Sequence, residues 1–387
     1  MSSAALSLQT FAVPETAAPS SAALPLHMRS IAPAEWDDAV AGFDEICQEQ
    51  LSAFAASRWP GVVREPLLFL RGETVVGGCL VMVQPLPLRL GAIAVAKWAP
   101  MLRHADSPDA TETYRQMIDA LCAEYGGRRG MMLSVLPRAS LQSENHDYTH
   151  LLSRGFHQGA KLLFPSRYIV NLRLSDPEQR QSFQQKWRYH LNKSERAGLS
   201  FERAMPDRLG AFDALYSQMV DRKKFPDHSA FGTMTELMAM PNATLRPELF
   251  FVRHGTEIVA GAIIFKAGDR AVYLYGATSA AALELRAGYF LHFHIIRWLR
   301  DNTAARWYDL GGTDGFHGLH QFKKGMVGER GVITPVPPVA NYAARLWPRL
   351  LGETAFAGRE LAHMLGRWID RLRPDRAKPD QQRPGRD

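Results

Sequence analysis

The stretch LLFLRGETVVGGCLVMV, residues 67–83, recurs in outline as LFFVRHGTEIVAGAIIFK, residues 249–266. Each stretch has an apolar run, a turn that contains arginine and glycine, and a second apolar run with two β-branched residues before a small residue and a glycine. Short β-branched runs on both sides of a glycine-containing turn are typical of a β-hairpin. The sequence therefore predicts the same hairpin twice.

The elements around each hairpin also repeat in order. A helix is predicted before each hairpin, at 33–56 and 208–224, because apolar residues recur there at helical spacing. A strand, a helix and a strand follow each hairpin, at 92–102, 109–125 and 129–137 and again at 271–278, 288–302 and 306–312. This order predicts the α/β class, with two domains of common ancestry.

Composition indicates a globular protein of two or three domains. The chain has 387 residues, of which 46% are apolar, and a formal net charge of +7 that favours anionic partners without specifying them. Its three cysteines, Cys47, Cys79 and Cys122, form no C-x-x-C pair, which predicts a reducing compartment. No run approaches the ~18–20 apolar residues of a membrane span. Residues 1–26 are expected to be a disordered tail rather than a signal peptide, so a cytoplasmic location is predicted.

Five stretches resemble a known family: KWAPMLR (97–103), LLSRGFHQG (151–159), KWRYHLNKSERAGLSFE (186–202), RLGAFDALYSQMVDRKKF (208–225) and YDLGGTDGFHGLHQFKKGMVGE (308–329). With the duplication, they resemble two tandem copies of the acyl-CoA N-acyltransferase (GNAT) fold, as in the Fem family of peptidoglycan aminoacyltransferases and its acetyltransferase-like relatives. The chain lacks a coiled-coil arm and the Gly-Pro often found in the first stretch. These departures leave the donor open.

The resemblance implies two GNAT-like domains, residues 27–165 and 166–337, each a mixed central sheet flanked by helices, with the active site in the second. Amphipathic helices are expected at 338–373 and a disordered tail at 374–387. The implied activity is transfer of an acyl group from acyl-CoA, or of an amino acid from aminoacyl-tRNA, to an amine of a cell-envelope precursor. The alternative is an inactive GNAT-like module that binds such a precursor or a partner protein.

Lys323 is the first candidate for catalysis, because it aligns with the Phe-Lys of the family motif, and Lys324 follows it. A lysine beside the tetrahedral intermediate stabilises negative charge on the oxyanion or on the departing oxygen; the alternative for either lysine is an exposed surface charge. Asp309, on the strand before the glycine loop, is expected either to accept the proton of the incoming amine or to brace the loop.

The start of the helix near Gly288 is a candidate phosphate-binding site. In a GNAT-like site the helix N-terminus faces the phosphates of the donor, which makes Arg286 a charge partner and Gly288 a point of close backbone approach. Gly288 could equally just begin the helix.

The basic helix 183–197 is a second candidate binding element. Phe183, Trp187 and Leu191 recur every four residues and predict a buried stripe. The resemblance places the neighbouring polar residues beside the acceptor cleft, where they would bind a pyrophosphate or a carboxylate; a solvated basic face is the alternative. These residues are Lys186, Arg188, Asn192 and Lys193.

The histidines of the second repeat and the basic C-terminal stretch each have a functional and a purely structural interpretation. His317 and His320 are spaced for one helical turn, but without a third ligand no metal site is predicted; His292 and His294 are expected to be packed core histidines. The basic amphipathic stretch 340–373 suggests contact with an anionic inner-membrane surface. The alternative is that this stretch packs on its own domain.

Overall fold

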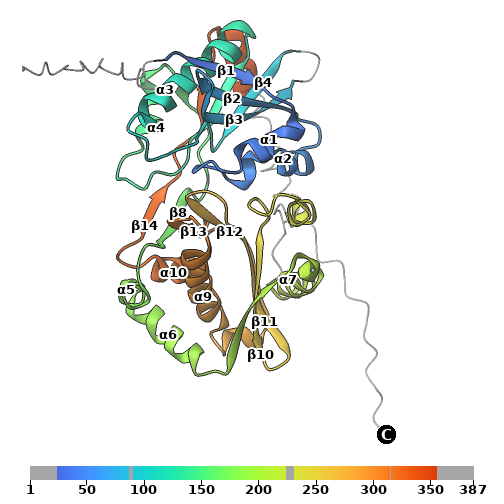
Figure 1. The fold of residues 1–387 in the computed structure, drawn as a ribbon, viewed down its shortest axis with the longest axis vertical. Helices are drawn as coiled ribbons and strands as arrows, with labels where there is room; N and C mark the ends of the chain where they lie inside the picture. Colours follow the sequence, from blue (N-terminus) through green and yellow to red (C-terminus); the bar gives the residue numbers. More distant parts are fainter. Residues whose placement is uncertain (1–23, 87–89, 224–230, 314, 355–387) are drawn as a thin grey trace, which may run out of the picture.

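The computed structural model describes residues 24–86, 90–223, 231–313 and 315–354. They form two domains stacked along the long axis, each built on a mixed β-sheet with helices on its faces (Figure 1). This confirms the predicted α/β class with two repeated units. Among the described residues, no helix has the length and apolarity needed to cross a membrane.

Sheet A belongs to the first domain. Its strand order is β1-β2-β3-β4-β6-β15-β7, and the short β5 pairs with β3. The strands are β1 (Leu26–Ser30), β2 (Val63–Arg71), β3 (Thr74–Pro85), β4 (Ala92–Lys97), β5 (Met101–Leu102), β6 (Met132–Leu136), β7 (His157–Gln158) and β15 (Ala340–Tyr342). The helices of this domain are α1 (Pro33–Val40), α2 (Ser52–Arg58), α3 (Ala110–Leu121) and α4 (His146–Ser153).

Sheet B belongs to the second domain, with the order β14-β8-β13-β12-β11-β10-β9. The strands are β8 (Ser166–Asn171), β9 (Leu199–Ala204), β10 (Glu248–His254), β11 (Glu257–Phe265), β12 (Arg270–Thr278), β13 (Trp307–Asp309) and β14 (Val332–Pro335). The helices are α5 (Asp176–Ser182), α6 (Gln185–Glu195), α7 (Leu209–Lys223), α8 (Met234–Met238), α9 (Ala287–Asn302) and α10 (His317–Val327).

Both predicted hairpins are present and share an irregularity. The register of β2 against β3 shifts between Phe69 and Leu70, and that of β10 against β11 shifts between Val252 and Arg253. In each hairpin the shift lies opposite the β-branched residues that precede the small-glycine pair. The repeated sequence pattern therefore corresponds to a repeated bulge.

The glycines of these pairs make room for aromatic side chains. A Cβ on Gly78 would lie 2.8 Å from the ring of Trp36 in α1, and a Cβ on Gly261 would lie 3.1 Å from the ring of Phe212 in α7. Trp36 and Phe212 are fully buried. The helix before each hairpin therefore packs directly on strand backbone.

The predicted helix 33–56 is wrong as a single helix. The chain leaves α1 at Val40 and begins α2 at Ser52, where the Asp37 carboxylate accepts bonds from the N–H groups of Ser52 (2.6 Å) and Ala53 (3.1 Å). The buried Gln50 side chain between the two helices also bonds the N–H of Leu80 at 2.8 Å. These long-range bonds stabilise the break, and helical periodicity does not reveal them.

Other predicted elements are shortened. The expected strand 92–102 is interrupted at Trp98, whose φ of 56° is in the left-handed region. The expected strand 306–312 is only three residues long, β13. Lys323, expected in the loop after that strand, lies instead on α10.

The chain returns to the first domain after β14. Strand β15 pairs with β6 and β7 of sheet A, and Ser134 donates a hydrogen bond to Asn341 at 2.7 Å. This strand lies in the stretch 338–373 for which only helices were predicted, whereas residues 346–354 are helical. The predicted tails at 1–26 and 374–387 lie mostly or wholly outside the described residues.

The two domains share a core. One cluster of buried side chains combines Trp36 and Leu80 of the first domain with Phe212, Leu237 and Ile263 of the second. The Asp269 backbone N–H also donates to the carbonyl of Asp44 at 2.6 Å. Contacts of both kinds fix the geometry of the junction between the domains.

Replacing Gly78 with alanine should destabilise the protein. The new Cβ must displace the buried Trp36 ring, and overpacking of this kind costs about 1–3 kcal/mol. Urea unfolding at equilibrium measures the loss. Gly42→Ala is the matched control, because nothing lies within 4 Å of its Cβ position; equal stabilities of the two variants would contradict the prediction.

Candidate active site

The site begins where two parallel strands of sheet B part. Strand β12 pairs with β13 only between Arg270–Val272 and Trp307–Asp309, although β12 continues to Thr278. The corresponding strands of sheet A, β4 and β6, stay paired over Ile93–Lys97. The second domain therefore has a gap between its central strands, and the first domain keeps its sheet closed at the corresponding point.

Lys323 lines this gap from α10. Its side chain is buried, with 5% of the residue exposed, and its Nζ donates to the carbonyl oxygens of Leu310 and Gly312 at the end of β13. The Nζ also lies 5.7 Å from the centroid of the Tyr273 ring on β12. Gly311, with φ of 74°, provides the turn between the two carbonyls. Its neighbour Lys324 is exposed.

His292 lies behind Lys323 in the core of the second domain. Burial, and then the charge of Lys323, lower the pKa of His292 to about 3. Its Nδ1 is 3.1 Å from the hydroxyl of Tyr308, and its ring lies 5.0 Å from that of Tyr273. His292 is therefore a neutral, hydrogen-bonded core residue, as expected, and it is not a proton acceptor at physiological pH.

Asp309 is held by Arg167. The guanidinium donates three hydrogen bonds to the carboxylate at 3.0–3.1 Å, and the N–H of Gly311 donates another at 2.9 Å. Burial alone would raise the pKa of Asp309, but the charges of Arg167 and Arg270 and this backbone bond keep the pKa below its usual value. The geometry fits the bracing role better than proton acceptance.

Arg286 and Gly288 stand at the start of α9. Arg286 adopts φ of 57°, and its buried Nε has no hydrogen-bond partner among the described residues. A Cβ on Gly288 would make only ordinary contact with the Phe322 ring, at 3.8 Å. The protein itself leaves space beside Gly288 for a ligand at the helix N-terminus.

Basic side chains of α6 surround the same helix start. The ring of His190 packs 4.9 Å from that of Tyr289 in the first turn of α9. Burial lowers the pKa of His190, and the nearby charges of Arg286, Lys186 and Lys193 lower it further. Both lysines are exposed. The fold thus gathers three predicted phosphate-binding residues in one region.

The other two predicted residues of α6 have different surroundings. Arg188 donates to the carbonyls of Gln181 and Phe183, at 2.7 and 2.6 Å, and so stabilises the bend between α5 and α6. Asn192 is exposed and accepts a long bond of 3.5 Å from Arg180. The predicted apolar stripe of this helix is confirmed, because Phe183, Trp187 and Leu191 are all buried.

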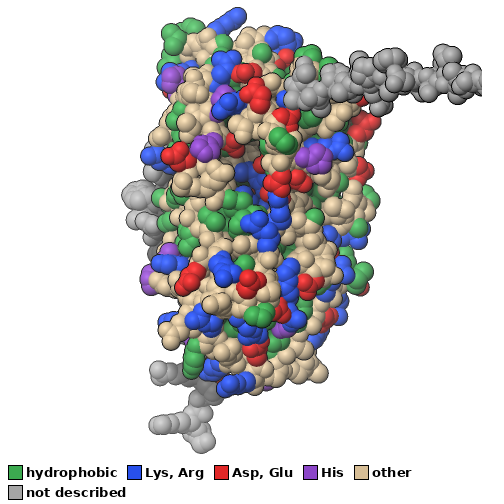
Figure 2. Space-filling view, turned by 60° about the vertical axis from the view of Figure 1, so that its left-hand side comes forward, with side chains coloured by type: hydrophobic (Ala, Val, Ile, Leu, Met, Phe, Trp, Pro, Cys, Tyr) green, Lys and Arg blue, Asp and Glu red, His purple; other side chains and the backbone are tan. Residues whose placement is uncertain are grey.

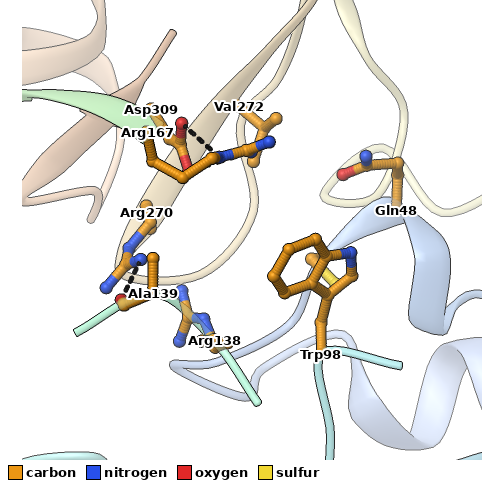
Figure 3. Close-up of a pocket in the computed structure, with 9 residues that line it drawn as sticks. Gln48, Trp98, Arg138, Ala139, Arg167, Arg270, Val272 and Asp309 are labelled. Carbon is orange, nitrogen blue, oxygen red and sulfur yellow. Dashed lines mark hydrogen bonds and ion pairs between the residues drawn. The ribbon is translucent and has the colours of Figure 1, made fainter. Parts of the chain in front are cut away.

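Sequence reasoning missed a pocket between the domains. Three arginines enter it from separate segments: Arg138 after β6, Arg167 in β8 and Arg270 at the start of β12 (Figure 3). Lys and Arg side chains also gather around the hollow at mid-height of the face in Figure 2. These three arginines are far apart in sequence and have no shared spacing. Of the residues that line the pocket, only Trp98 and Asp309 lay in stretches quoted above.

The pocket and the gap contain no ready nucleophile or metal cluster. Burial raises the pKa of the Cys47 thiol, which lines the pocket, to about 11. Among the described residues, no group of three or more His, Cys, Asp or Glu side chains is arranged to hold a metal ion.

The chain resembles known proteins in part of its sequence and in its fold. Residues 181–324 match the family model described as Acetyltransferase (GNAT) domain, while no curated protein matches. FemX superposes with a TM-score of 0.69 at 16% identity, covering 84% of this chain and 98% of that one. L-PGS from Bacillus licheniformis has a TM-score of 0.50 at 13% identity, covering 84% and 96%. The C-terminal domain of a protein described as a lysylphosphatidylglycerol synthetase from Agrobacterium fabrum has 0.51 at 14%, covering 84% and 95%.

These findings confirm the Fem-like tandem GNAT architecture predicted from the sequence. The segment that matches the GNAT domain model, residues 181–324, contains the parted strands β12 and β13 and Lys323.

His292 should make stability depend on pH. Because its folded pKa, about 3, is below the unfolded value of about 6.5, the stabilisation is fully present above pH 6.5 and is lost as the pH falls. Between pH 6.5 and 4, His292→Gln should remove a slope of about 1.4 kcal/mol per pH unit from the free energy of unfolding. Urea unfolding at several pH values measures it; an unchanged slope would contradict the assignment.

Proposed function

We propose that this protein transfers an acyl group from acyl-CoA to a primary amine of a cell-envelope precursor, at the gap between β12 and β13. The observation that carries the proposal is the buried amino group of Lys323, held at the edge of this gap by two carbonyls of the glycine loop. A buried lysine at this point also argues against the alternative of an inactive binding module, which would not need it.

The proposed chemistry is direct transfer. The acceptor amine attacks the carbonyl carbon of the thioester, and an oxyanion forms on the carbonyl oxygen. The C–S bond then breaks, and the departing thiolate takes up the proton that the amine releases. Lys323 stabilises the oxyanion through its positive charge. Asp309 acts indirectly, since its pairing with Arg167 fixes the end of β13 next to the loop that Lys323 binds.

The donor site supports acyl-CoA over aminoacyl-tRNA. The start of α9, with Arg286 and the space beside Gly288, suits a compact pyrophosphate, and Lys186 and Lys193 add positive charge nearby. A tRNA would require many phosphate contacts over a long basic channel. Arg188 and Asn192 lie on the same helix, α6, and in this proposal they position the surface that carries Lys186 and Lys193.

The acceptor class rests on the fold neighbours and on the C-terminal segment. The fold neighbours, FemX and the C-terminal domain of a lysylphosphatidylglycerol synthetase, support an acceptor of the cell envelope. In the helical residues 346–354, Leu346, Trp347 and Leu350 are exposed by 75%, 73% and 52%. Such side chains suit contact with the cytoplasmic face of a membrane, where lipid-linked precursors are found.

Lys323→Met should abolish most of the activity. Removing a group that stabilises the oxyanion lowers kcat by about 10²–10³-fold, and the effect on KM should be small. Steady-state kinetics with acetyl-CoA, longer acyl-CoAs and an envelope-precursor extract measure it. Lys324→Met is the matched control, because that lysine is adjacent and exposed; equal activity of the two variants would remove Lys323 from the mechanism.

Arg286→Ala should weaken donor binding. Loss of a phosphate contact should raise the KM for acyl-CoA about tenfold, equivalent to about 1.4 kcal/mol, with little change in kcat. Arg345→Ala, at an exposed position, serves as the control. The salt dependence of KM separates the donors: a shallow slope is expected for acyl-CoA, whereas transfer from aminoacyl-tRNA with a steep slope would contradict the proposed donor.

A further inference from the structure

The pocket between the domains has the construction of a binding site. Its cavity has a volume of about 40 Å³, within a hollow of about 390 Å³ that includes open solvent. The Trp98 ring and Val272 contribute apolar surface from different sides of the pocket, and most of the other lining side chains are polar (Figure 3). The polar lining residues are Gln48, Arg138, Arg167, Arg270 and Asp309.

Two of the three arginines are neutralised by carboxylates. Arg167 is paired with Asp309 at 3.0 Å. Arg138 is paired with Asp269 at 3.0 Å and with Glu45 at 3.3 Å. These pairs satisfy the charges on two sides of the pocket and leave the third arginine to be explained.

Arg270 has no such partner. Only 7% of the residue is exposed; its Nη1 donates to the carbonyl of Ala139 at 2.9 Å, and its buried Nε has no partner among the described residues. Burial, and then the charge of Arg138, lower the pKa of Arg270 to about 10, so it remains a cation at neutral pH. Asp309, Asp269 and Glu45 act on Arg270 only at longer range. Its buried Nε therefore still lacks an acceptor, which an anionic ligand would supply.

Gln48 provides a second polar atom without a partner in the same pocket. Its buried Oε1 accepts no hydrogen bond from the described residues. Figure 3 shows Gln48 on the side of the pocket opposite Arg270. An amide oxygen accepts only from a donor, so the ligand that satisfies both residues carries an N–H as well as an anionic oxygen.

We propose that this pocket binds the carboxylate of an amino acid or of a peptide C-terminus. The carboxylate accepts a hydrogen bond from the Nε of Arg270, and the neighbouring amine or amide N–H of the ligand donates to Gln48. The N–H donor that Gln48 requires distinguishes an amino acid or a peptide from inorganic phosphate.

The pocket is next to the proposed acyl-transfer site. Asp309 and Val272 line the pocket, and the following residues of their strands, Leu310 and Tyr273, contact Lys323. Successive side chains of a strand point to opposite faces of the sheet. The pocket and Lys323 therefore lie on opposite faces of sheet B, at the last β12–β13 pair, Val272 and Asp309, beyond which the gap opens. The bound carboxylate therefore belongs to the acceptor, a conclusion that rests on the proposed function.

Calorimetric titration of the full chain tests the site without an activity measurement. The probes are the dipeptide alanylalanine, its C-terminal amide and inorganic phosphate, at constant ionic strength. The amide and phosphate should each bind at least tenfold more weakly than the dipeptide. Arg270→Met should weaken dipeptide binding at least tenfold, whereas Arg253→Met should not, because Arg253 pairs with Glu202 near the far edge of sheet B.

Several results would overturn the proposal: no dipeptide binding at millimolar concentration, equal binding of the amide, or tighter binding of phosphate. If Arg270→Met does not fold, Gln48→Met decides, because methionine is similar in length to Gln48 and lacks the amide oxygen that accepts from the N–H of the ligand. Unchanged dipeptide binding to that variant contradicts the proposal. Lys323→Met must still bind the dipeptide, so loss of transfer with intact binding separates failure of the two proposals.

Discussion

The parting of β12 and β13 is the constraint on which the site depends. Parallel strands normally continue to exchange hydrogen bonds, as β4 and β6 do in the first domain. In the second domain the pairing stops at Val272 and Asp309. The salt bridge from Arg167 fixes Asp309 at that point, and the turn at Gly311 directs the following carbonyls to Lys323. The end of the pairing between β12 and β13 thereby creates the gap. The residues that follow β13 hold Lys323, and the last paired residues, Val272 and Asp309, line the interdomain pocket.

The two repeated domains share the packing of the hairpin against the preceding helix and differ in the pairing of their central strands. Each hairpin keeps its bulge and its glycine, because the aromatic ring of the preceding helix fills the space where a Cβ would stand. The first domain retains this packing with a closed sheet. It contributes to the interdomain pocket through Gln48, Trp98 and Arg138. The proposed division of labour is that the second domain performs transfer and the first completes the acceptor site.

Prediction from sequence succeeded where structure is local. The hairpins and the stripe of Phe183, Trp187 and Leu191 follow from patterns of neighbouring residues. Prediction failed for the helix 33–56, because the Asp37 carboxylate in α1 accepts hydrogen bonds from the Ser52 and Ala53 N–H groups at the start of a second helix, α2. The role of Asp309 was also undecided until its partner, Arg167, was seen across the sheet.

The sequence by itself determined the repeated α/β units, because periodicity and glycine punctuation are encoded in consecutive residues. It also singled out the end of the second repeat, through the Phe-Lys motif. Only the tertiary structure decided which charges meet. Arg138, Arg167 and Arg270 come from three strands or strand ends of two domains. Arg138 and Arg167 pair with carboxylates far away in the chain, whereas the buried Nε of Arg270 has no hydrogen-bond partner among the described residues. Burial and partner choice are properties of the folded whole, and they set the chemistry of both the gap and the pocket.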